Sequence, residues 1–418
     1  MRISDKLGMA IALVGLLAVL LPTSVAGADE MVTFSDPSLQ AAVRAAIEKP
    51  TGDIYRSDLE DLTRLSADVK GITDLAGLEY CTGLTELSLA YNEISDLSPL
   101  SNLTNLRRLH FHKNEISDLT PLVNLTSLTR VSFSDNQISD ISPLSNLTGL
   151  TELHLSENEI SDLTPLSNLS NLSVLTLQNN EIGDISVLSN LTGLTELYLW
   201  RNQASDVTPL SNLTGLTDLR LGYNQIIDIS PLRNLTGLTV LHLGGNQISD
   251  ISPLSNLTGL TVLHLWKNRI DDVTPLSDLD RLIHLSLWWN RISDIAPLLE
   301  NSGLGDGDSL DLTDNPLSTI SVDIYIPNLQ ERGVKVSWGS ALDSTPTPTP
   351  TPMITPISTP PPFPSIITPT LTPASTSLLT PSPASDEEVP FNVWVVIGPV
   401  VGVLLAGGVV YYLVRRRR

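Results

Sequence analysis

Hydrophobic residues recur along the middle of the chain in an order that repeats every 22 residues. Each unit contains a stretch such as Leu84-Thr-Glu-Leu87-Ser-Leu89, in which the later leucines alternate with other residues. A period of two predicts a short β-strand with its leucines on one face. One asparagine follows each stretch, at positions 92, 114, 136, 158, 180, 202, 224, 246, 268 and 290. The pattern predicts a strand and a turn per unit, with a ladder of asparagine amides that satisfies backbone groups of the turns.

The second half of each unit predicts a short helical segment on the outer side. In Asp96-Leu97-Ser98-Pro99-Leu100, we expect Ser98 as the N-cap and Pro99 at the first helical position. A unit of 22 residues leaves no room for a long helix, so a 3₁₀ turn or an irregular segment is expected. No unit can bury its leucines alone, and stacking creates one continuous core. The predicted fold is a solenoid, or horseshoe, with a parallel β-sheet on its concave face.

About twelve units extend over residues 62–315. An irregular first unit places Leu65 and Ile72 in the same frame, and a late unit ends at Asn315 after a three-residue insertion. A hydrophobic core that is built by stacking has two open ends, so we expect a cap at each end.

Residues 29–61 predict the N-terminal helical cap. Its helix begins at Asp36-Pro37, and Leu39, Val43 and Ile47 share one helical face. Residues 316–340 predict the C-terminal cap, with a short helix over 327–332 that Gly333 ends and a last strand over 334–336.

These units resemble the 22-residue leucine-rich repeats of bacterial internalins and their relatives. The resemblance covers residues 62–340 and rests on the specific motif N-x-I-x-D-[LIV]-x-P-L, and the two expected caps are similar to those of the family. It implies a right-handed horseshoe that binds other macromolecules on its concave sheet. The host-receptor role of the listerial invasion proteins does not carry over, because the segment after the repeats departs from theirs.

Both ends of the chain predict a secreted, anchored protein. Residues 1–28 combine a basic start, an apolar run and small residues, as a signal peptide does, with a retained N-terminal anchor as the alternative. Residues 341–390 are rich in Pro, Thr and Ser and predict an extended stalk. Residues 391–414 are long and apolar enough for a transmembrane helix, and the arginines of 415–418 indicate a cytoplasmic tail. We expect a single-pass protein of the cell membrane with an extracellular repeat domain.

Composition narrows the classes of function. The formal net charge of −22 disfavours binding to nucleic acid. The single cysteine, Cys81, excludes a disulfide framework within one chain and occupies a slot that later units fill with leucine, so we expect it in the core. No Ser/His/Asp arrangement, glycine-rich phosphate loop or paired-carboxylate motif occurs in the sequence. We therefore expect neither an enzyme nor a cofactor.

An aspartate follows each of the ten regular asparagines by four residues. We expect each carboxylate to cap its own turn through backbone N–H groups, with a calcium site as the alternative. The insertion contains Asp306-Gly-Asp308 and Asp311, a spacing that only loosely resembles a calcium loop. Recurring Asn-Leu-Thr and Asn-Leu-Ser triplets are formal glycosylation sequons, which we interpret as structural.

Positions on the concave side carry most of the chemical variety of the chain. Counted back from each asparagine, they are offsets seven, six, four, two and one, and they hold all six histidines and four of the six tryptophans. Exposed aromatic and arginine side chains are typical of binding hot spots, although aromatic residues also favour strands in general. The candidate ligand-binding residues are Tyr198, Trp200, Arg201, Arg220, Tyr223, His242, His264, Trp266, Lys267, His284, Trp288 and Trp289.

Two details of this set suggest finer sites. At offset two, Trp200 and Trp266 flank a pair of glycines, which predicts a slot for a peptide or a short glycan, unless glycine merely suits the turn. His242 and His264 occupy the same offset on adjacent units, about 5 Å apart. Two imidazoles at that spacing could share a metal, but no third ligand is evident, so we expect hydrogen-bonding contacts instead.

The leading hypothesis is a cell-surface binding module, either an adhesin or a receptor ectodomain, with a protein or glycan partner. The rival hypothesis is a passive structural component of the envelope. Binding requires a defined concave patch, whereas passive packing tolerates its loss.

Overall fold

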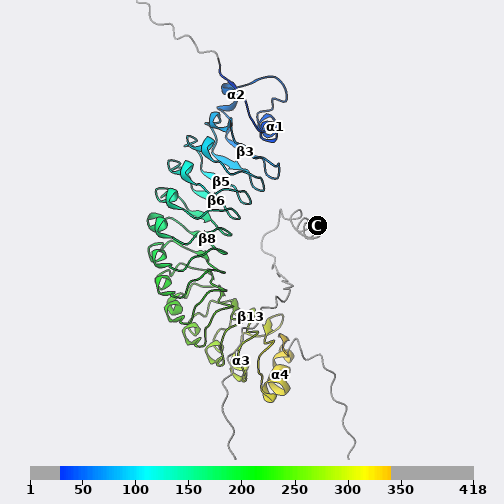
Figure 1. Cartoon of the computed structure of the whole chain (residues 1–418). Coiled ribbons are helices and arrows are strands. Elements are labelled where there is room, and N and C mark those ends of the chain that lie inside the picture. Colours follow the sequence, from blue (N-terminus) through cyan, green and yellow to red (C-terminus); the bar gives the residue numbers. More distant parts are fainter. Residues whose placement is uncertain (1–28, 340–418) are drawn as a thin grey trace, which may run out of the picture. The chain divides into compact units, whose positions relative to one another are not determined.

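The computed structural model describes residues 29–339, which form a curved solenoid (Figure 1). Thirteen parallel strands, β3 to β15, lie in sequence order in one sheet. Each strand pairs with the strand of the next repeat in the same register, so that Leu197 lies beside Leu219 and Leu219 beside Leu241. The predicted solenoid with a parallel sheet is confirmed.

The strands of this sheet contain three residues each. They are β3 (Arg64–Ser66), β4 (Glu86–Ser88), β5 (Arg108–His110), β6 (Arg130–Ser132), β7 (Glu152–His154), β8 (Val174–Thr176), β9 (Glu196–Tyr198), β10 (Asp218–Arg220), β11 (Val240–His242), β12 (Val262–His264), β13 (His284–Ser286), β14 (Ser309–Asp311) and β15 (Lys335–Ser337).

Short 3₁₀ helices follow the turns and line the outer edge of the arc in Figure 1. They are η1 (Leu78–Tyr80), η2 (Ser98–Leu100), η3 (Thr120–Leu122), η4 (Ser142–Leu144), η5 (Thr164–Asn168), η6 (Ser186–Asn190), η7 (Thr208–Leu210), η8 (Ser230–Asn234), η9 (Ser252–Leu254) and η10 (Thr274–Leu276). The last regular repeat has the α-helix α3 (Ala296–Glu300) in this place.

The capping residue of these helices differs from our expectation. Ser98 is the first residue of η2 rather than its N-cap, and Asp96 accepts a hydrogen bond of 2.8 Å from the Ser98 backbone N–H. The same bond recurs at each aspartate of the column, from Asp118 to Asp294. The expected capping role of the aspartates is confirmed, because a carboxylate two residues back reaches the free N–H more directly than the serine hydroxyl can.

Leucines of the strands and helices fill the interior of the solenoid. Leu197 and Leu199, on either side of the outward-facing Tyr198, are both fully buried, as the alternation predicts. Cys81 lies in the same core, where burial raises the pKa of its thiol to about 12. Its predicted role as a small core residue is confirmed by its complete burial.

The asparagines form the predicted ladder. Asn202 donates through its Nδ2 to the carbonyl oxygens of Leu177 and Leu199, at 2.9 and 3.0 Å, and its Oδ1 accepts from the backbone N–H of Ile182. One side chain therefore satisfies groups of its own repeat and of the preceding one. Since the asparagine is buried, these bonds replace water that the turn would otherwise need.

A second ladder was not predicted. Thr195 donates through Oγ1 to the carbonyl oxygen of Ser173, at 3.0 Å, and Thr217 donates to Thr195 in turn. The same bond links threonine or serine at offset seven in eight repeats. Offset seven is therefore a structural position in most repeats, and counting it among the variable concave positions was wrong.

The N-terminal cap contains the antiparallel pair β1 (Met31–Val32) and β2 (Ile54–Tyr55), the helix α1 (Pro37–Ala46) and the short helix α2 (Arg56–Leu59). The Asp36 carboxylate caps α1 through the N–H groups of Ser38 and Leu39, as its position before proline predicts. Leu39 and Val43 are buried against the first repeats, which closes this end of the core.

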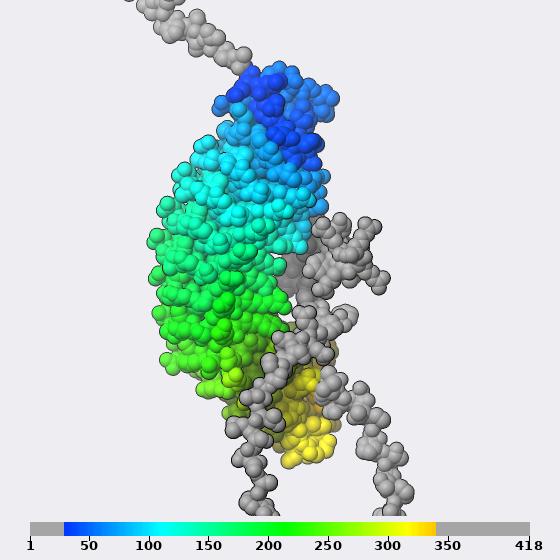
Figure 2. Space-filling view, viewed as in Figure 1, coloured from blue at the N-terminus to red at the C-terminus, as the bar shows by residue number. Residues whose placement is uncertain are grey.

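The C-terminal cap contains a turn of π-helix, η11 (Ser321–Tyr325), the helix α4 (Ile326–Glu331) and strand β15. Gly333 follows α4 with a φ of 92°, in agreement with the predicted helix end. Figure 2 shows a continuous surface from the N-terminal cap through the repeats to this second cap. The predicted signal peptide, stalk, transmembrane helix and tail lie outside the described residues. Within residues 29–339, no helix combines the length and the apolar character needed to span a membrane.

Candidate functional site

Strands β9 to β13 and the turns after them bring all twelve candidate residues to the concave side of the sheet. We call these twelve residues, from Tyr198 to Trp289, the C-terminal concave surface. Their leucine neighbours point into the core, so each candidate side chain stands on a rigid strand or on the turn that follows it. Most of them are half-buried rather than freely exposed, because they pack on one another. Trp289 is 51% exposed.

Two indole rings stack at the centre of this surface. The rings of Trp266 and Trp288 lie nearly parallel, with an interplanar angle of 12° and a centroid separation of 5.2 Å. On its other side, the Trp266 ring covers Gly244, and a Cβ atom at position 244 would overlap the indole. Gly244, Trp266 and Trp288 occupy the same position in three consecutive repeats. Both faces of the Trp266 ring are therefore covered, one by Gly244 and the other by Trp288.

Tyr223 fills the space above the neighbouring glycine. A Cβ atom on Gly245 would lie 2.8 Å from Cδ1 of Tyr223, and the Tyr223 ring meets Trp266 edge to face at 4.9 Å. The repeat that ends in Gly244-Gly245 therefore receives aromatic rings from the repeats on both sides. The slot predicted between Trp200 and Trp266 is not open over these glycines. Periodicity fixed the positions of the two tryptophans, but it could not show that Trp266 folds back over the smaller residues.

Two cations flank Tyr223. The Arg201 guanidinium carbon lies 5.5 Å from the centroid of the Tyr223 ring and 5.1 Å from that of Trp200. The Lys267 ammonium lies 5.6 Å from the Tyr223 centroid and 5.1 Å from that of Trp289. Such cation–π contacts are worth about 0.5–1 kcal/mol at exposed sites. The rings thereby hold both cations in place at the surface.

The turn after each strand explains how these side chains are presented. Arg201, Tyr223, Lys267 and Trp289 all occupy the position just before the ladder asparagine, and all have φ between 51° and 55°. This left-handed backbone costs a residue with a Cβ roughly 1–2 kcal/mol, and only glycine adopts it freely. Gly245 occupies the same position in its own repeat, with φ 72°, and as a glycine it adopts this conformation freely. The others occupy a conformation that their own side chains disfavour.

His242 and His264 form a second stack. Their imidazole rings lie 4.1 Å apart with an interplanar angle of 11°. Burial lowers the pKa of His242 to about 3 and that of His264 to about 4, with smaller contributions from the neighbouring cationic groups. The nitrogen lone pairs of stacked imidazoles lie in two parallel planes. They therefore do not converge on one point, as they would to bind a shared metal ion. Within residues 29–339, no three His, Cys, Asp or Glu side chains gather as a metal site would require.

The remaining histidine of the surface, His284, is exposed and makes a hydrogen bond of 2.7 Å between Nδ1 and the Ser309 hydroxyl. For His242 and His264, the observed contact is ring stacking instead.

A polar network borders the aromatic residues. Arg220 makes two hydrogen bonds to the Asp218 carboxylate, at 3.0 and 2.8 Å, and its guanidinium lies 4.5 Å from the Tyr198 ring centroid. The Tyr198 hydroxyl donates to Glu196 and Asp218. Burial and these carboxylates raise the pKa of Tyr198, and the Asp218 carboxylate raises the pKa of Arg220. Arg220 is therefore engaged within the protein, in contrast to Arg201.

The N-terminal half of the concave face is a ladder of paired charges. Glu86 lies 3.5 Å from both Arg64 and Arg108, and Arg130 lies 2.9 Å from Glu152. Each of these cations has a carboxylate partner on an adjacent strand. The aromatic stack is confined to the C-terminal half, as the sequence predicts.

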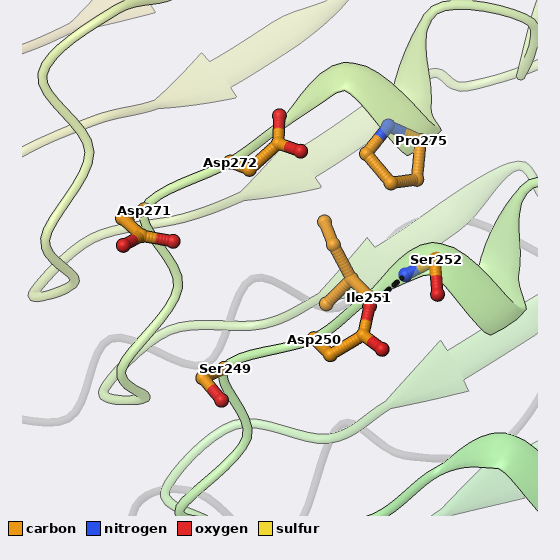
Figure 3. Close-up of a pocket in the computed structure, with 7 residues that line it drawn as sticks. All are labelled: Ser249, Asp250, Ile251, Ser252, Asp271, Asp272 and Pro275. Atoms are coloured by element: carbon orange, nitrogen blue, oxygen red, sulfur yellow. Dashed lines mark hydrogen bonds between the residues drawn. The ribbon is translucent and has the colours of Figure 1, made fainter.

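A shallow depression of about 360 Å³ lies between two outer turns (Figure 3). Asp250, Asp271 and Asp272 line it, but Asp250 and Asp272 already accept backbone hydrogen bonds from the residues they cap. In the insertion, Asp308 and Asp311 likewise accept bonds from nearby N–H groups. Asp250 and Asp272 thus cap their own turns, and Asp308 and Asp311 bind backbone N–H groups of the insertion and of the residues after β14.

Comparisons with known proteins agree with the repeat. A family model described as leucine-rich repeats in two copies matches residues 82–124, 126–168, 170–212 and 214–256. The comparison with curated proteins gave no match.

Among solved structures, an internalin (InlF) from Listeria monocytogenes is similar to this chain. The sequences are 36% identical, the match covers 76% of this chain and 94% of the internalin, and the TM-score is 0.71. A leucine-rich repeat protein from Leptospira interrogans shares the fold at 22% identity and a TM-score of 0.53, over 66% of this chain and 84% of that protein. A plant peptide hormone receptor in complex with its peptide shares it at 22% identity and a TM-score of 0.54, over 68% of this chain and 54% of the receptor.

Proposed function

Because the chain belongs to the internalin-like family of leucine-rich repeat proteins, we propose that it is a cell-surface binding protein, an adhesin or a receptor ectodomain. Its ligand is a protein or a glycan outside the cell. The ligand docks on the C-terminal concave surface. The protein acts by binding and not by catalysis.

The assembled aromatic stack carries this proposal. Trp266, Trp288 and Tyr223 are fixed by one another and by the glycines beneath them before any ligand arrives. Ordered aromatic side chains lose little conformational entropy on binding, and they dominate the binding energy of many interfaces. A solvated strand has no structural need for tryptophan at these positions.

Membrane anchoring is the second part of the proposal. Its support is the sequence of segments that lie outside the described residues. These are the apolar segments within 1–28 and 391–414 and the arginines of 415–418. A binding protein of this kind holds its repeats outside the cell and its C-terminus in the cytoplasm.

The test is a binding screen of the full chain against glycans and surface proteins, followed by variants. We expect Trp266→Ala or Trp288→Ala to weaken ligand binding by about 2 kcal/mol or more, the scale of a hot-spot residue. Trp338→Ala is the matched control, because Trp338 lies after β15, outside the surface, and is 42% exposed. It should leave the affinity unchanged.

A passive envelope component is the rival function. If Trp200, Trp266 and Trp288 are all replaced by alanine, with the fold verified by circular dichroism, and the affinity for every ligand found stays the same, the surface is not the binding site. That result would favour the passive role.

A further inference from the structure

The C-terminal concave surface offers cations to its ligand. On strands β3 to β13 and at the left-handed positions after them, Arg64, Arg108, Arg130, Arg220 and Lys113 each pair with a carboxylate. Arg201 and Lys267 make no ion pair within residues 29–339 and lie over aromatic rings instead. A cation over a ring keeps most of its capacity to bind an anion. The face of an aromatic ring attracts the charge but leaves the N–H groups free for a carboxylate.

The strands around Lys267 hold no competing anion, and the two carboxylates on the strands beside Arg201, Glu196 and Asp218, are engaged with Tyr198 and Arg220. On strands β11 to β13 and the turns after them, no concave position holds Asp or Glu, although the chain has 46 acidic and 24 basic residues. The aspartate column lies beyond the ladder asparagines, with its carboxylates on backbone N–H groups. At physiological salt, charges act over only about 8 Å, so the surface is locally cationic within an acidic protein.

The rings of Trp266 and Tyr223 expose little flat area. Trp266 is covered on one face by Gly244 and on the other by Trp288, and Tyr223 has cations on its flanks. Sugar rings bind tryptophan mainly by lying on an open indole face, which the Trp266 ring does not offer. Ring edges and side-chain stems contact apolar side chains well.

We propose, on the basis of the function above, that the ligand is an acidic segment of a protein chain rather than a glycan. Two of its carboxylates bind Arg201 and Lys267, and an apolar side chain between them contacts Tyr223 and Trp266. Both cations lie within 5.6 Å of the Tyr223 ring centroid, so they flank one ring. In an extended segment, side chains two and four residues apart lie on the same face and the rise is about 3.3 Å per residue, so carboxylates about four residues apart, with the apolar residue midway, span the pair.

The experiment begins with a random peptide library displayed on phage and selected on the full chain. We expect the recovered peptides to contain two Asp or Glu residues about four positions apart with an apolar residue midway between them. A synthetic copy with both carboxylates changed to Gln or Asn should bind about tenfold or more weakly, since one charge-assisted hydrogen bond is worth about 1.5–3 kcal/mol. Added salt should weaken binding of the acidic copy and leave that of the neutral copy nearly unchanged.

Charge-removing variants of the protein locate the contact. Arg201→Met and Lys267→Met keep the length of the side chain and should each reduce the affinity for the acidic peptide by about tenfold. Lys113→Met is the matched control. Lys113 also has a left-handed backbone and lies 5.0 Å from a tyrosine centroid, but it pairs with Asp135 and stands in the N-terminal half.

The outcomes separate this inference from the proposed function. Recovery of no peptide that depends on Arg201 and Lys267, or of peptides without carboxylates, overturns the inference. A glycan that binds the full chain and is lost in Trp266→Ala, while both Met variants still bind it, overturns the inference but supports the proposed function. A ligand unaffected by Trp266→Ala and Trp288→Ala overturns both.

Discussion

At the residue scale, the glycines of the concave face decide where the aromatic rings lie. Gly244 has an ordinary backbone conformation, so its importance comes from the space that its missing side chain leaves for the Trp266 ring. Gly245 combines both properties, because it has a left-handed φ and lies under Tyr223. Small residues in one repeat thus set the orientation of large residues in the repeats on either side.

Replacement of Gly244 by alanine should displace the Trp266 ring and disrupt its stack on Trp288, because the new methyl group overlaps the indole. Coupled indoles give a strong circular dichroism band, so we expect that band to weaken while the unfolding temperature falls by only a few degrees. Gly183→Ala is the control, since a Cβ there meets no atom within 4 Å. An unchanged band in Gly244→Ala would show that the rings do not stack in solution.

The stacked histidines predict a pH dependence of stability. The pKa of His242 is about 3 and that of His264 about 4 in the folded protein, against 6.5 for a histidine side chain in water. The unfolded chain therefore binds more protons below pH 6.5, and stability falls as the pH decreases from 6.5 toward 4. The slope for each ring is less than the ~1.4 kcal/mol per pH unit of one full proton, because both rings are partly accessible to water.

Chemical unfolding at a series of pH values measures this effect. The double variant His242→Gln, His264→Gln should show a flatter dependence between pH 6.5 and 4 than the parent protein. His110→Gln is the control variant. It also removes one histidine of the concave face, but it keeps the stacked pair and every carboxylate of the protein. Equal slopes in all three proteins would contradict the low pKa values.

At the element scale, each repeat is held by its core leucines and by two hydrogen-bond ladders. Leu199→Ala should destabilise the protein by about 2–5 kcal/mol, because a fully buried leucine leaves a cavity between repeats. Thr195→Ala should cost about 0.5–1.5 kcal/mol, since it removes the hydrogen bond to Ser173. Thr214→Ala, at an exposed position of an outer turn, should cost less than about 0.5 kcal/mol. Denaturant unfolding distinguishes the three, and equal effects would contradict the assigned register.

The sequence predicted the register of the elements but not their side-chain packing. Spacing alone placed Leu199 inside, Asn202 in the turn and Cys81 in a leucine slot, because each is fixed by a strict period. The threonine ladder was visible as a nearly constant residue at offset seven, and its uniformity was the missed signal. The packing of the Trp266 ring over Gly244 depends on the rotamer of the tryptophan and on which residue the neighbouring repeat supplies. The 22-residue period contains neither piece of information.

At the scale of the whole molecule, the proposed topology makes a direct prediction. Protease added to intact cells should release a soluble fragment that contains the repeats and leave a small membrane-bound remnant with the C-terminal arginines. Antibodies against the two parts, used on washed membranes and on the supernatant, measure the distribution. Cells lysed before protease treatment provide the control, and complete protection of the repeats in intact cells would contradict the extracellular orientation.

The direction of the sheet hydrogen bonds has a mechanical consequence. The bonds between strands run along the solenoid from β3 to β15, as do the asparagine and threonine bonds. Tension along the solenoid therefore loads the bonds between all repeats in series, and a terminal repeat, which has a neighbour on one side only, opens before the central ones. Under tension, the solenoid should lengthen in steps of about one unfolded repeat. Each step absorbs the work that is needed to break the bonds of that repeat.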